Sequence, residues 1–172
     1  MLNISRLESG ILKIKNDWCD INEVIYEVIK KTKETKVTQR FDIQIPDSLP
    51  YFFIDHGLME QVLLNLIHNA VTYSPADTTI SICASCIIDQ LVITVEDQGN
   101  GFPADQIDKV FGRFYRLNNS RTGGTGLGLS IVKGFVEAQN GTVSLNNKSG
   151  GGAIFTISIP AKTSFINNLK NE

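Results

Sequence analysis

The spacing of apolar residues along the chain predicts three long helices. Over residues 21–29 and 59–70, apolar side chains recur every three or four positions, so each segment has one face that can be buried. Asp20 and Asp55 stand where these helices begin. Each carboxylate can cap a helix, because it accepts hydrogen bonds from backbone amides that the first turn leaves unpaired. A third helix is predicted over residues 127–138, and a shorter one over 106–110.

Strands are predicted where short apolar or alternating segments lie between turn residues. They are residues 14–18, 41–45, 51–54, 79–87, 91–96, 142–145 and 154–159. Because the strands pair as hairpins and helices intervene three times, the order favours an α+β fold: a two-layer sandwich of a mixed sheet with helices on one face. Residues 1–12 are expected to be a helix end, 13–160 the domain itself and 161–172 a loose tail.

Composition excludes several classes of function. Sixteen basic and eighteen acidic residues give a net charge of −2, which argues against nucleic-acid binding, since affinity for phosphate backbones needs an excess of lysine and arginine. No apolar run approaches the roughly 20 residues that cross a membrane. Residues 1–6 lack the basic and apolar regions of a signal peptide. We therefore expect a soluble cytoplasmic domain without direct membrane contact.

The three cysteines fit a reducing compartment. Cys83 and Cys86 have the spacing of a metal or redox pair, but they lie in an apolar segment that is predicted to be a strand. Residues three apart on a strand point to opposite faces, and no second cysteine or histidine pair lies nearby in the sequence. We therefore favour a structural role for Cys83 and Cys86 over a metal or redox role.

Glycine is concentrated in the second half of the chain. Twelve of the fourteen glycines lie between Gly99 and Gly152. Glycine is needed where the backbone adopts a positive φ or approaches a ligand closely. The first half is thus expected to be ordinary scaffold and the second half to contain unusual backbone.

Two asparagines occupy the interior of the second predicted helix. Asn65 and Asn69 are four residues apart, so both amides project from one face. Asparagine is a poor helix former, and amide oxygens can bind a hard cation such as Mg²⁺, which also keeps phosphate and water ligands. The alternative is that both amides hydrogen-bond to neighbouring backbone groups.

Two further segments complete a nucleotide-binding pattern. Asp97 follows the strand 91–96, where its carboxylate can accept a hydrogen bond from the amine of a base, and Gly99 and Gly101 let the main chain pass beneath the ring. Residues 123–128 run into a helix, whose N-terminal amides form an anion site. No Gly-Lys-Ser/Thr follows, so this is not a P-loop, and the glycines do not match a dinucleotide-binding fingerprint.

The order of these motifs resembles the catalytic ATP-binding domain of sensor histidine kinases. The motifs are Asn65-x-x-x-Asn69-Ala70, Asp97-x-Gly99-x-Gly101, Phe111-x-x-Phe114-Tyr115-Arg116, Gly124-x-Gly126-x-Gly128 and Gly150-Gly151-Gly152-Ala153-x-Phe155. The resemblance covers residues 1–160, and residues 5–10 resemble the end of the family's dimerisation helices. Together with Asp17 and Trp18, they are similar to the potassium-sensing KdpD-type kinases.

The resemblance implies the ATP-binding fold shared with gyrase, Hsp90 and MutL. It assigns Mg²⁺ binding to Asn69, with Asn65 beside it on metal or phosphate. The base would be covered by Tyr73 and bound by Asp97 above a floor of Gly99 and Gly101. The phosphates would lie against the loop of Gly124, Gly126, Leu127 and Gly128, and Arg116 would reach the terminal phosphate. Arg116 and Asn65 are the expected catalytic residues, ATP and Mg²⁺ the expected ligands, and residues 102–125 the expected lid, with Phe111 and Phe114 favoured as its anchors.

The chain departs from the family at Thr72, where lysine is usual, and at Ala153, where threonine is common. It also lacks the phosphoacceptor motif, since neither His56 nor His68 resembles it. The resemblance therefore implies that the chain phosphorylates a histidine on a dimerisation domain absent from it, with a response regulator downstream. The resemblance is compatible with a full-length protein anchored in the inner membrane, and it leaves the presence of an upstream membrane domain open.

Two alternatives remain open at this point. A hydrolysing relative carries glutamate where Asn65 stands, because activation of water needs a general base. Asn65 thus favours transfer to histidine over an ATPase of the gyrase type. A regulatory module that binds nucleotide without kinase activity is the second alternative, and Thr72 lends it some support.

Overall fold

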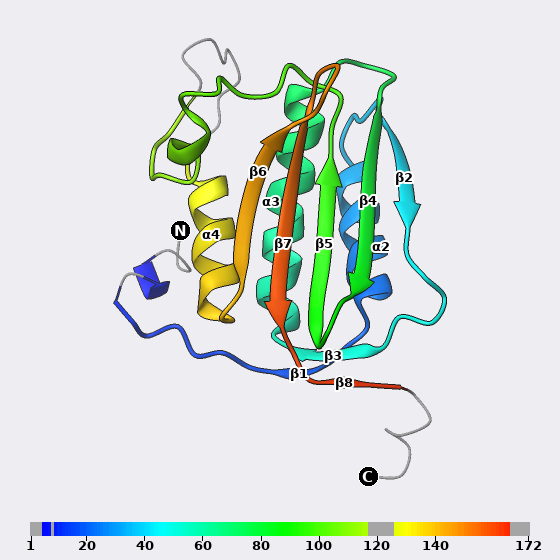
Figure 1. The fold of residues 1–172 in the computed structure, drawn as a ribbon, viewed down its shortest axis with the longest axis vertical. Helices are drawn as coiled ribbons and strands as arrows, with labels where there is room; N and C mark the ends of the chain where they lie inside the picture. Colours follow the sequence, from blue (N-terminus) through cyan, green and yellow to red (C-terminus); the bar gives the residue numbers. More distant parts are fainter. Residues whose placement is uncertain (1–4, 8, 117–125, 166–172) are drawn as a thin grey trace.

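Five strands form a mixed sheet in the order β2-β4-β5-β7-β6 (Figure 1). The structure is a computed structural model that describes residues 5–7, 9–116 and 126–165. β2 (Arg40–Gln44) runs parallel to β4 (Thr79–Cys86). The other neighbours are antiparallel: β4 with β5 (Gln90–Glu96), β5 with β7 (Ala153–Pro160), and β7 with β6 (Thr142–Asn147).

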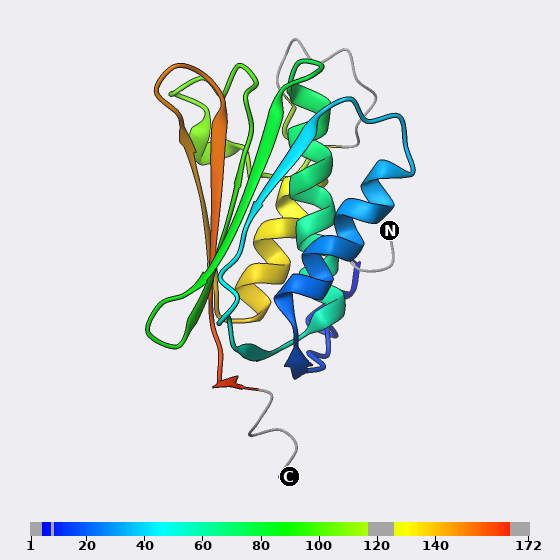
Figure 2. The same cartoon turned by 90° about the vertical axis from the view of Figure 1, so that its right-hand side faces the viewer.

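Three helices cover one face of this sheet (Figure 2). They are α2 (Ile21–Lys33), α3 (His56–Tyr73) and α4 (Gly128–Ala138). Alternate residues of the central strands, such as Ile80, Ile93 and Ile157, are fully buried, because successive side chains of a strand point to opposite faces and only one face meets the helices. The predicted α+β two-layer sandwich is confirmed.

Two aspartates start the first two helices as predicted. Asp20 accepts a hydrogen bond from the amide of Asn22 (2.9 Å). Asp55 Oδ1 accepts from the amide of Leu58 (3.0 Å), and its Oδ2 accepts from the amide of Lys15 (2.8 Å). The Asp55 amide itself donates to Gln139 Oε1 (3.1 Å) at the end of α4. Asp55 therefore ties together α3, α4 and the segment that leads into β1 (Asp17–Cys19).

A second, three-stranded sheet was not predicted. It has the order β1-β3-β8, with β3 (Tyr51–Ile54) between β1 and β8 (Thr163–Ser164), and all pairs are antiparallel. β8 pairs with β3 beyond residue 160, so the loose tail expected over 161–172 is wrong for these two residues. Residues 166–172 lie outside the described part of the chain. The short helix expected near 106–110 is a 3-10 helix, η1 (Ile107–Lys109).

The N-terminal segment ends a helix, as predicted. Residues 5–7 are helical, and Gly10 follows with φ +66°. The amide of Ile11 donates to Arg6 O (3.1 Å) and that of Gly10 to Leu7 O (3.4 Å), the two bonds that end a helix at a left-handed glycine. The side chain of Leu7 lies against Gly134 of α4, where an added Cβ would be 2.2 Å from Leu7 Cδ2.

Among the described residues, no helix has both the length and the apolar character needed to span a bilayer.

Candidate functional site

The predicted site residues gather at one end of the molecule. Figure 1 shows the C-terminal ends of α3 and β5 and the β6–β7 turn toward its upper end, with α4 beginning lower down. Asn65, Asn69 and Tyr73 lie on α3, and Asp97 follows β5. Gly128 begins α4, and Gly152 and Ala153 begin β7. The topology thus unites motifs that are up to 88 residues apart in sequence, from Asn65 to Ala153.

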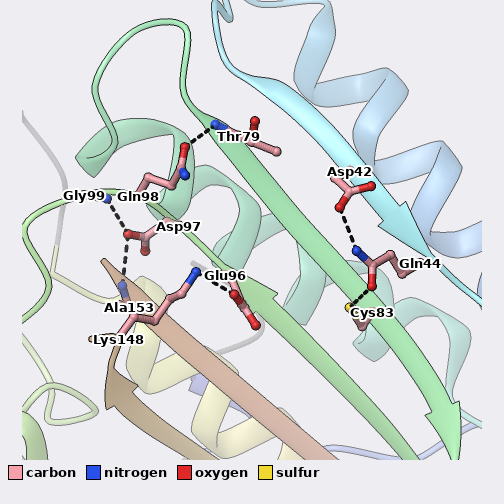
Figure 3. Close-up of polar contacts among 10 residues, drawn as sticks. All are labelled: Asp42, Gln44, Thr79, Cys83, Glu96, Asp97, Gln98, Gly99, Lys148 and Ala153. Atoms are coloured by element: carbon pink, nitrogen blue, oxygen red, sulfur yellow. Dashed lines mark hydrogen bonds and ion pairs between the residues drawn. The ribbon is translucent and has the colours of Figure 1, made fainter. Parts of the chain in front are cut away.

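Asp97 is the buried acid of this end, with 4% of its surface exposed. Its Oδ1 accepts hydrogen bonds from the amides of Gly99 (2.8 Å) and Ala153 (3.2 Å), as Figure 3 shows. Within the described residues, Oδ2 accepts no hydrogen bond. Burial raises the pKa of Asp97, whereas the amides of Gly99 and Ala153 and the charge of Lys148 act to lower it. One oxygen is therefore fixed by the backbone and the other remains available as an acceptor.

Glycines allow three backbone segments to meet around Asp97. A Cβ on Gly99 would lie 2.4 Å from the carbonyl oxygen of Tyr73, so only glycine fits between β5 and the end of α3. Gly152 has φ +98°, and a Cβ there would lie 2.1 Å from the carbonyl oxygen of Asp97. Any side chain at these two positions would separate the segments.

Asn65 brings α3 to the start of α4. Its Nδ2 donates to Gln61 O (2.8 Å), one turn earlier in α3. Its Oδ1 lies 3.1 Å from the position of a Cβ on Gly128. The side-chain nitrogen of Asn65 therefore hydrogen-bonds to a neighbouring backbone carbonyl, as the alternative to metal binding expects. The side-chain oxygen faces the N-terminus of α4. Asn69 lies one turn further along α3 and is partly buried, whereas His68 beside it is exposed.

The start of α4 has the features of an anion site. Leu127 occupies the N-cap position, and its side chain makes no capping hydrogen bond. Gly126 has φ +70° and packs against the backbone of Phe114 and Tyr115. Gly124 lies outside the described residues. Free amides at a helix N-terminus attract phosphate oxygens, so the described residues fit the predicted phosphate loop.

The aromatic residues near the site have different roles. Tyr73 ends α3 with 39% of its surface exposed, as a residue available to a ligand must be. Phe111 packs edge-on against Phe155 (centroids 6.2 Å apart), which supports its predicted role as an anchor. Phe114 has φ +59° and is 72% exposed, so it does not pack into the core. Arg116 is exposed and stands at the border of the described segment.

Asn147 is a residue of this end that the sequence did not indicate. Its Oδ1 accepts from the amide of Phe102 (2.8 Å), and its Nδ2 donates to the carbonyl oxygen of Phe102 (2.7 Å). Its side chain thereby pairs with the backbone as a neighbouring strand would. Beside it, Lys148 forms an ion pair with Glu96 (2.7 Å), shown in Figure 3. The sequence signal for this role of Asn147 was weak, because two asparagines before Lys148-Ser149-Gly150 are also typical of a turn.

The surroundings of Cys83 and Cys86 fit a structural role for this pair. Cys83 Sγ lies 3.6 Å from Gln44 Oε1 on the neighbouring strand, and Cys86 is exposed. Over residues 5–7, 9–116 and 126–165, no three histidine, cysteine, aspartate or glutamate side chains come together to hold a metal ion. The amides of Asn65 and Asn69 belong to a different type of site, in which phosphate and water complete the coordination.

Comparison with known proteins identifies the family. Residues 54–163 match the family described as histidine kinase-, DNA gyrase B-, and HSP90-like ATPase. The chain belongs to this family. The matched segment runs from the last residue of β3 to the first residue of β8 and contains the five motifs around Asp97, Asn65 and the start of α4.

The similar full-length proteins are sensor kinases. The chain is 33% identical over 164 residues to the sensor protein KdpD of Escherichia coli (strain K12), a match that covers 95% of this chain and 18% of KdpD. It is 36% identical over 168 residues to the sensor histidine kinase WalK of Bacillus subtilis (strain 168), covering 94% and 28%. The chain thus spans less than a third of these relatives, and the similarity does not single out the KdpD type.

Solved structures agree with this assignment. Full-length ShkA in complex with AMPPNP has a TM-score of 0.83 and 27% identity, with 95% of this chain and 35% of ShkA covered. The catalytic domain of the histidine kinase ThkA has a TM-score of 0.74 and 25% identity, with 87% and 96% covered. The predicted fold and family are therefore confirmed.

Proposed function

We propose that this chain is the catalytic domain of a sensor histidine kinase and binds Mg-ATP between α3 and the start of α4. The observation that carries the proposal is Asp97. Its Oδ1 is fixed by two backbone amides, and its Oδ2 is left to accept a hydrogen bond from the amine of adenine. A buried carboxylate without a use would destabilise the fold.

The remaining residues supply the other parts of a nucleotide site. Tyr73 covers the base, and Gly99 and Gly101 form its floor. Gly124, Gly126, Leu127 and Gly128 bind the phosphates through backbone amides at the uncapped start of α4. The amide oxygens of Asn69 and Asn65 fit Mg²⁺, which would neutralise charge on the phosphate oxygens. Arg116 acts on the terminal phosphate, where a cation stabilises developing charge.

Transfer to histidine fits this site better than hydrolysis does. Asn65 stands beside Gly128 and has no basic group that could activate water. His56 and His68 are both exposed on α3 and lie outside any acceptor motif. The acceptor is thus a histidine on the dimerisation domain of the same kinase, residues 1–12 being the end of that domain's helix. A response regulator then receives the phosphate, and the whole kinase is anchored in the inner membrane with this domain in the cytoplasm.

The test is titration calorimetry with ADP and AMPPNP, with and without Mg²⁺. Wild type should bind both. Asp97→Asn should weaken binding by about 10- to 100-fold, since it replaces a charge-assisted hydrogen bond with two opposed donors. Asn69→Ala should remove most of the effect of Mg²⁺. Asp89→Asn, at the exposed β4–β5 turn, and His68→Ala, beside Asn69, are matched controls that should bind as wild type does.

A second assay separates the kinase from its alternatives. With radiolabelled ATP and a separately produced dimerisation domain, the acceptor histidine should be labelled, and the chain alone should release little phosphate. Steady hydrolysis by the chain alone would favour an ATPase. Nucleotide binding without labelling of any acceptor would favour a regulatory module, and a folded chain that binds no nucleotide at millimolar concentration would refute the proposal.

A further inference from the structure

A proline leaves one carbonyl at the end of α3 without its helical partner. In an α-helix the carbonyl of one residue accepts a hydrogen bond from the amide four positions later, so the partner of Val71 O would be residue 75. That residue is Pro75, which has no N–H to donate. α3 ends at Tyr73, and its last turn contains no basic side chain that could bind the terminal carbonyls. The end of α3 therefore needs a donor from another element.

Gln39, the residue before β2, supplies this donor. Its Nε2 lies 3.2 Å from Val71 O, 3.0 Å from Ser74 O and 3.3 Å from Pro75 O. Val71 belongs to the last turn of α3, and Ser74 and Pro75 are the two residues after the helix. A side-chain amide has two N–H groups, which are shared here among three carbonyls. Gln39 thus caps the C-terminus of α3 from a segment that is 32 to 36 residues earlier in the chain.

The backbone of Tyr73 is held between this cap and the segment after β5. The Tyr73 carbonyl lies against Gly99, where a Cβ would be 2.4 Å from its oxygen. The next carbonyl, that of Ser74, is bound by Gln39. The Tyr73 side chain itself is exposed, so burial in the core does not fix it. The direction in which the ring projects therefore depends on the backbone that Gln39 and Gly99 hold.

We infer that Gln39 is a positioning residue for the nucleotide: by capping the end of α3, it orients Tyr73 over the base. This inference rests on the proposed function and adds to it a residue that lies outside all of the nucleotide motifs. Without the cap, the carbonyls at the end of α3 would have to turn toward water, and the last turn would fray. Binding would then have to order that turn, which lowers affinity.

The test is a double-mutant cycle between Gln39 and Tyr73, with ADP affinity measured by titration calorimetry up to millimolar nucleotide. Gln39→Met keeps an unbranched side chain of similar length and removes both donors. It should weaken ADP binding about three- to tenfold, the cost of ordering a short segment on binding. In a Tyr73→Ala background the same substitution should change the affinity less than about twofold, because the ring that needs orientation is absent.

Two further variants serve as controls. Gln39→Lys keeps a donor at this position, and because a cation is favoured at a helix C-terminus, it should bind ADP within about twofold of wild type. Gln44→Ala removes a glutamine from the other end of β2, where its Nε2 donates to Asp42 Oδ2 (2.8 Å), as Figure 3 shows. It should leave ADP affinity unchanged.

Three results would overturn the inference. A lower thermal midpoint of Gln39→Met with unchanged ADP affinity would show that the cap serves the fold alone. An equal loss of affinity in both backgrounds would show that Gln39 does not act through Tyr73, and Gln39→Lys binding as weakly as Gln39→Met would show that the donor is not what matters.

Should Gln39→Met fail to fold, Gln39→Asn enters the same cycle, since its amide is one methylene shorter and cannot reach all three carbonyls. Failure of the wild type to bind ADP would instead refute the proposed function, so the two failures are distinguishable.

Discussion

At the scale of single residues, Asp97 combines two properties that oppose each other. Burial disfavours its charge, while two backbone amides and Lys148 favour it. The net result is a pKa above the ordinary value, so the carboxylate contributes less to stability when ionised than a solvated one would. This cost is consistent with a group kept for a ligand, because Oδ2 has a role only when a donor is supplied from outside.

The raised pKa of Asp97 predicts how stability depends on pH. The native state binds this proton more tightly than the unfolded chain does. The stabilising contribution is therefore complete below the unfolded value of about 3.9 and is lost as pH rises through the native pKa. Relative to Asp97→Asn, wild type should lose stability over this interval, and at pH 7 the variant should be at least as stable. Asparagine can keep both backbone bonds through its own oxygen.

Urea unfolding of both proteins at a series of pH values measures this difference. A variant that is less stable than wild type at pH 7, with the difference shrinking at acidic pH, would show instead that the ionised form stabilises the fold.

Local patterns predict the positions of Asp97 after a strand, of Asn65 within a helix and of Gly128 at a helix start, and the structure has the three residues at these positions. Asn147 and Ser74 could not be found in this way. The contacts of Asn147 are with Phe102, 45 residues earlier, and the buried side-chain hydroxyl of Ser74 makes no hydrogen bond within the part of the chain that the structure describes. Neither spacing nor composition contains such information, since both depend on which segments the fold brings together.

At the scale of elements, the start of each helix was easier to predict than the pairing of short strands. Asp20 and Asp55 mark the starts of α2 and α3, because the carboxylate of each accepts a local hydrogen bond from a backbone amide of the first turn. β8 has two residues, Thr163 and Ser164, which are too few to show an alternation. Its strand state arises from pairing with β3, and the sequence around it resembles a polar tail.

The contact between Leu7 and α4 gives a prediction at this scale. Replacing glycine with alanine inside a helix normally stabilises it by about 1 kcal/mol. For Gly134→Ala, the new methyl group would occupy the space of Leu7 Cδ2, so the gain should be largely cancelled. In a Leu7→Ala background the gain of about 1 kcal/mol should reappear. Chemical unfolding of the four proteins of this cycle measures the coupling. Equal effects of Gly134→Ala in both backgrounds would show that the two residues are not in contact in solution.

At the scale of the whole molecule, one apolar cluster joins the helices, the large sheet and the small sheet. Cys19 of β1 belongs to this cluster and is 3% exposed. Burial, together with the nearby carboxylates of Asp20 and Glu23, raises its pKa to about 12. The thiolate that reacts with alkylating agents is thus suppressed in the native state. Cys86, at the end of β4, is exposed to solvent.

Thiol labelling should therefore report whether the domain unfolds as a unit. With iodoacetamide and mass spectrometry, Cys86 should be modified at least about 100-fold faster than Cys19, because Cys19 reacts only after unfolding. Urea should accelerate the labelling of Cys19 in parallel with global unfolding measured by circular dichroism. Cys86→Ser is the control in which the labelling of Cys19 is followed without modification of Cys86. Labelling of Cys19 well before the global transition would mean that the small sheet opens separately.

The position of α4 gives it the geometry of a lever. At the end of α4, Gln139 accepts a hydrogen bond from the amide of Asp55. In the middle of the helix, Leu7 packs against Gly134, and at its start Gly128 lies beside Asn65. At 1.5 Å per residue, Gly128 lies roughly twice as far from Gln139 as Gly134 does, about 16 Å against 8 Å. A sideways displacement of the upstream helix at Leu7 would therefore arrive roughly doubled at Gly128. Shifts near 1 Å are enough to misplace reacting groups, so the packing of Leu7 against Gly134 helps to fix the position of Gly128 beside Asn65.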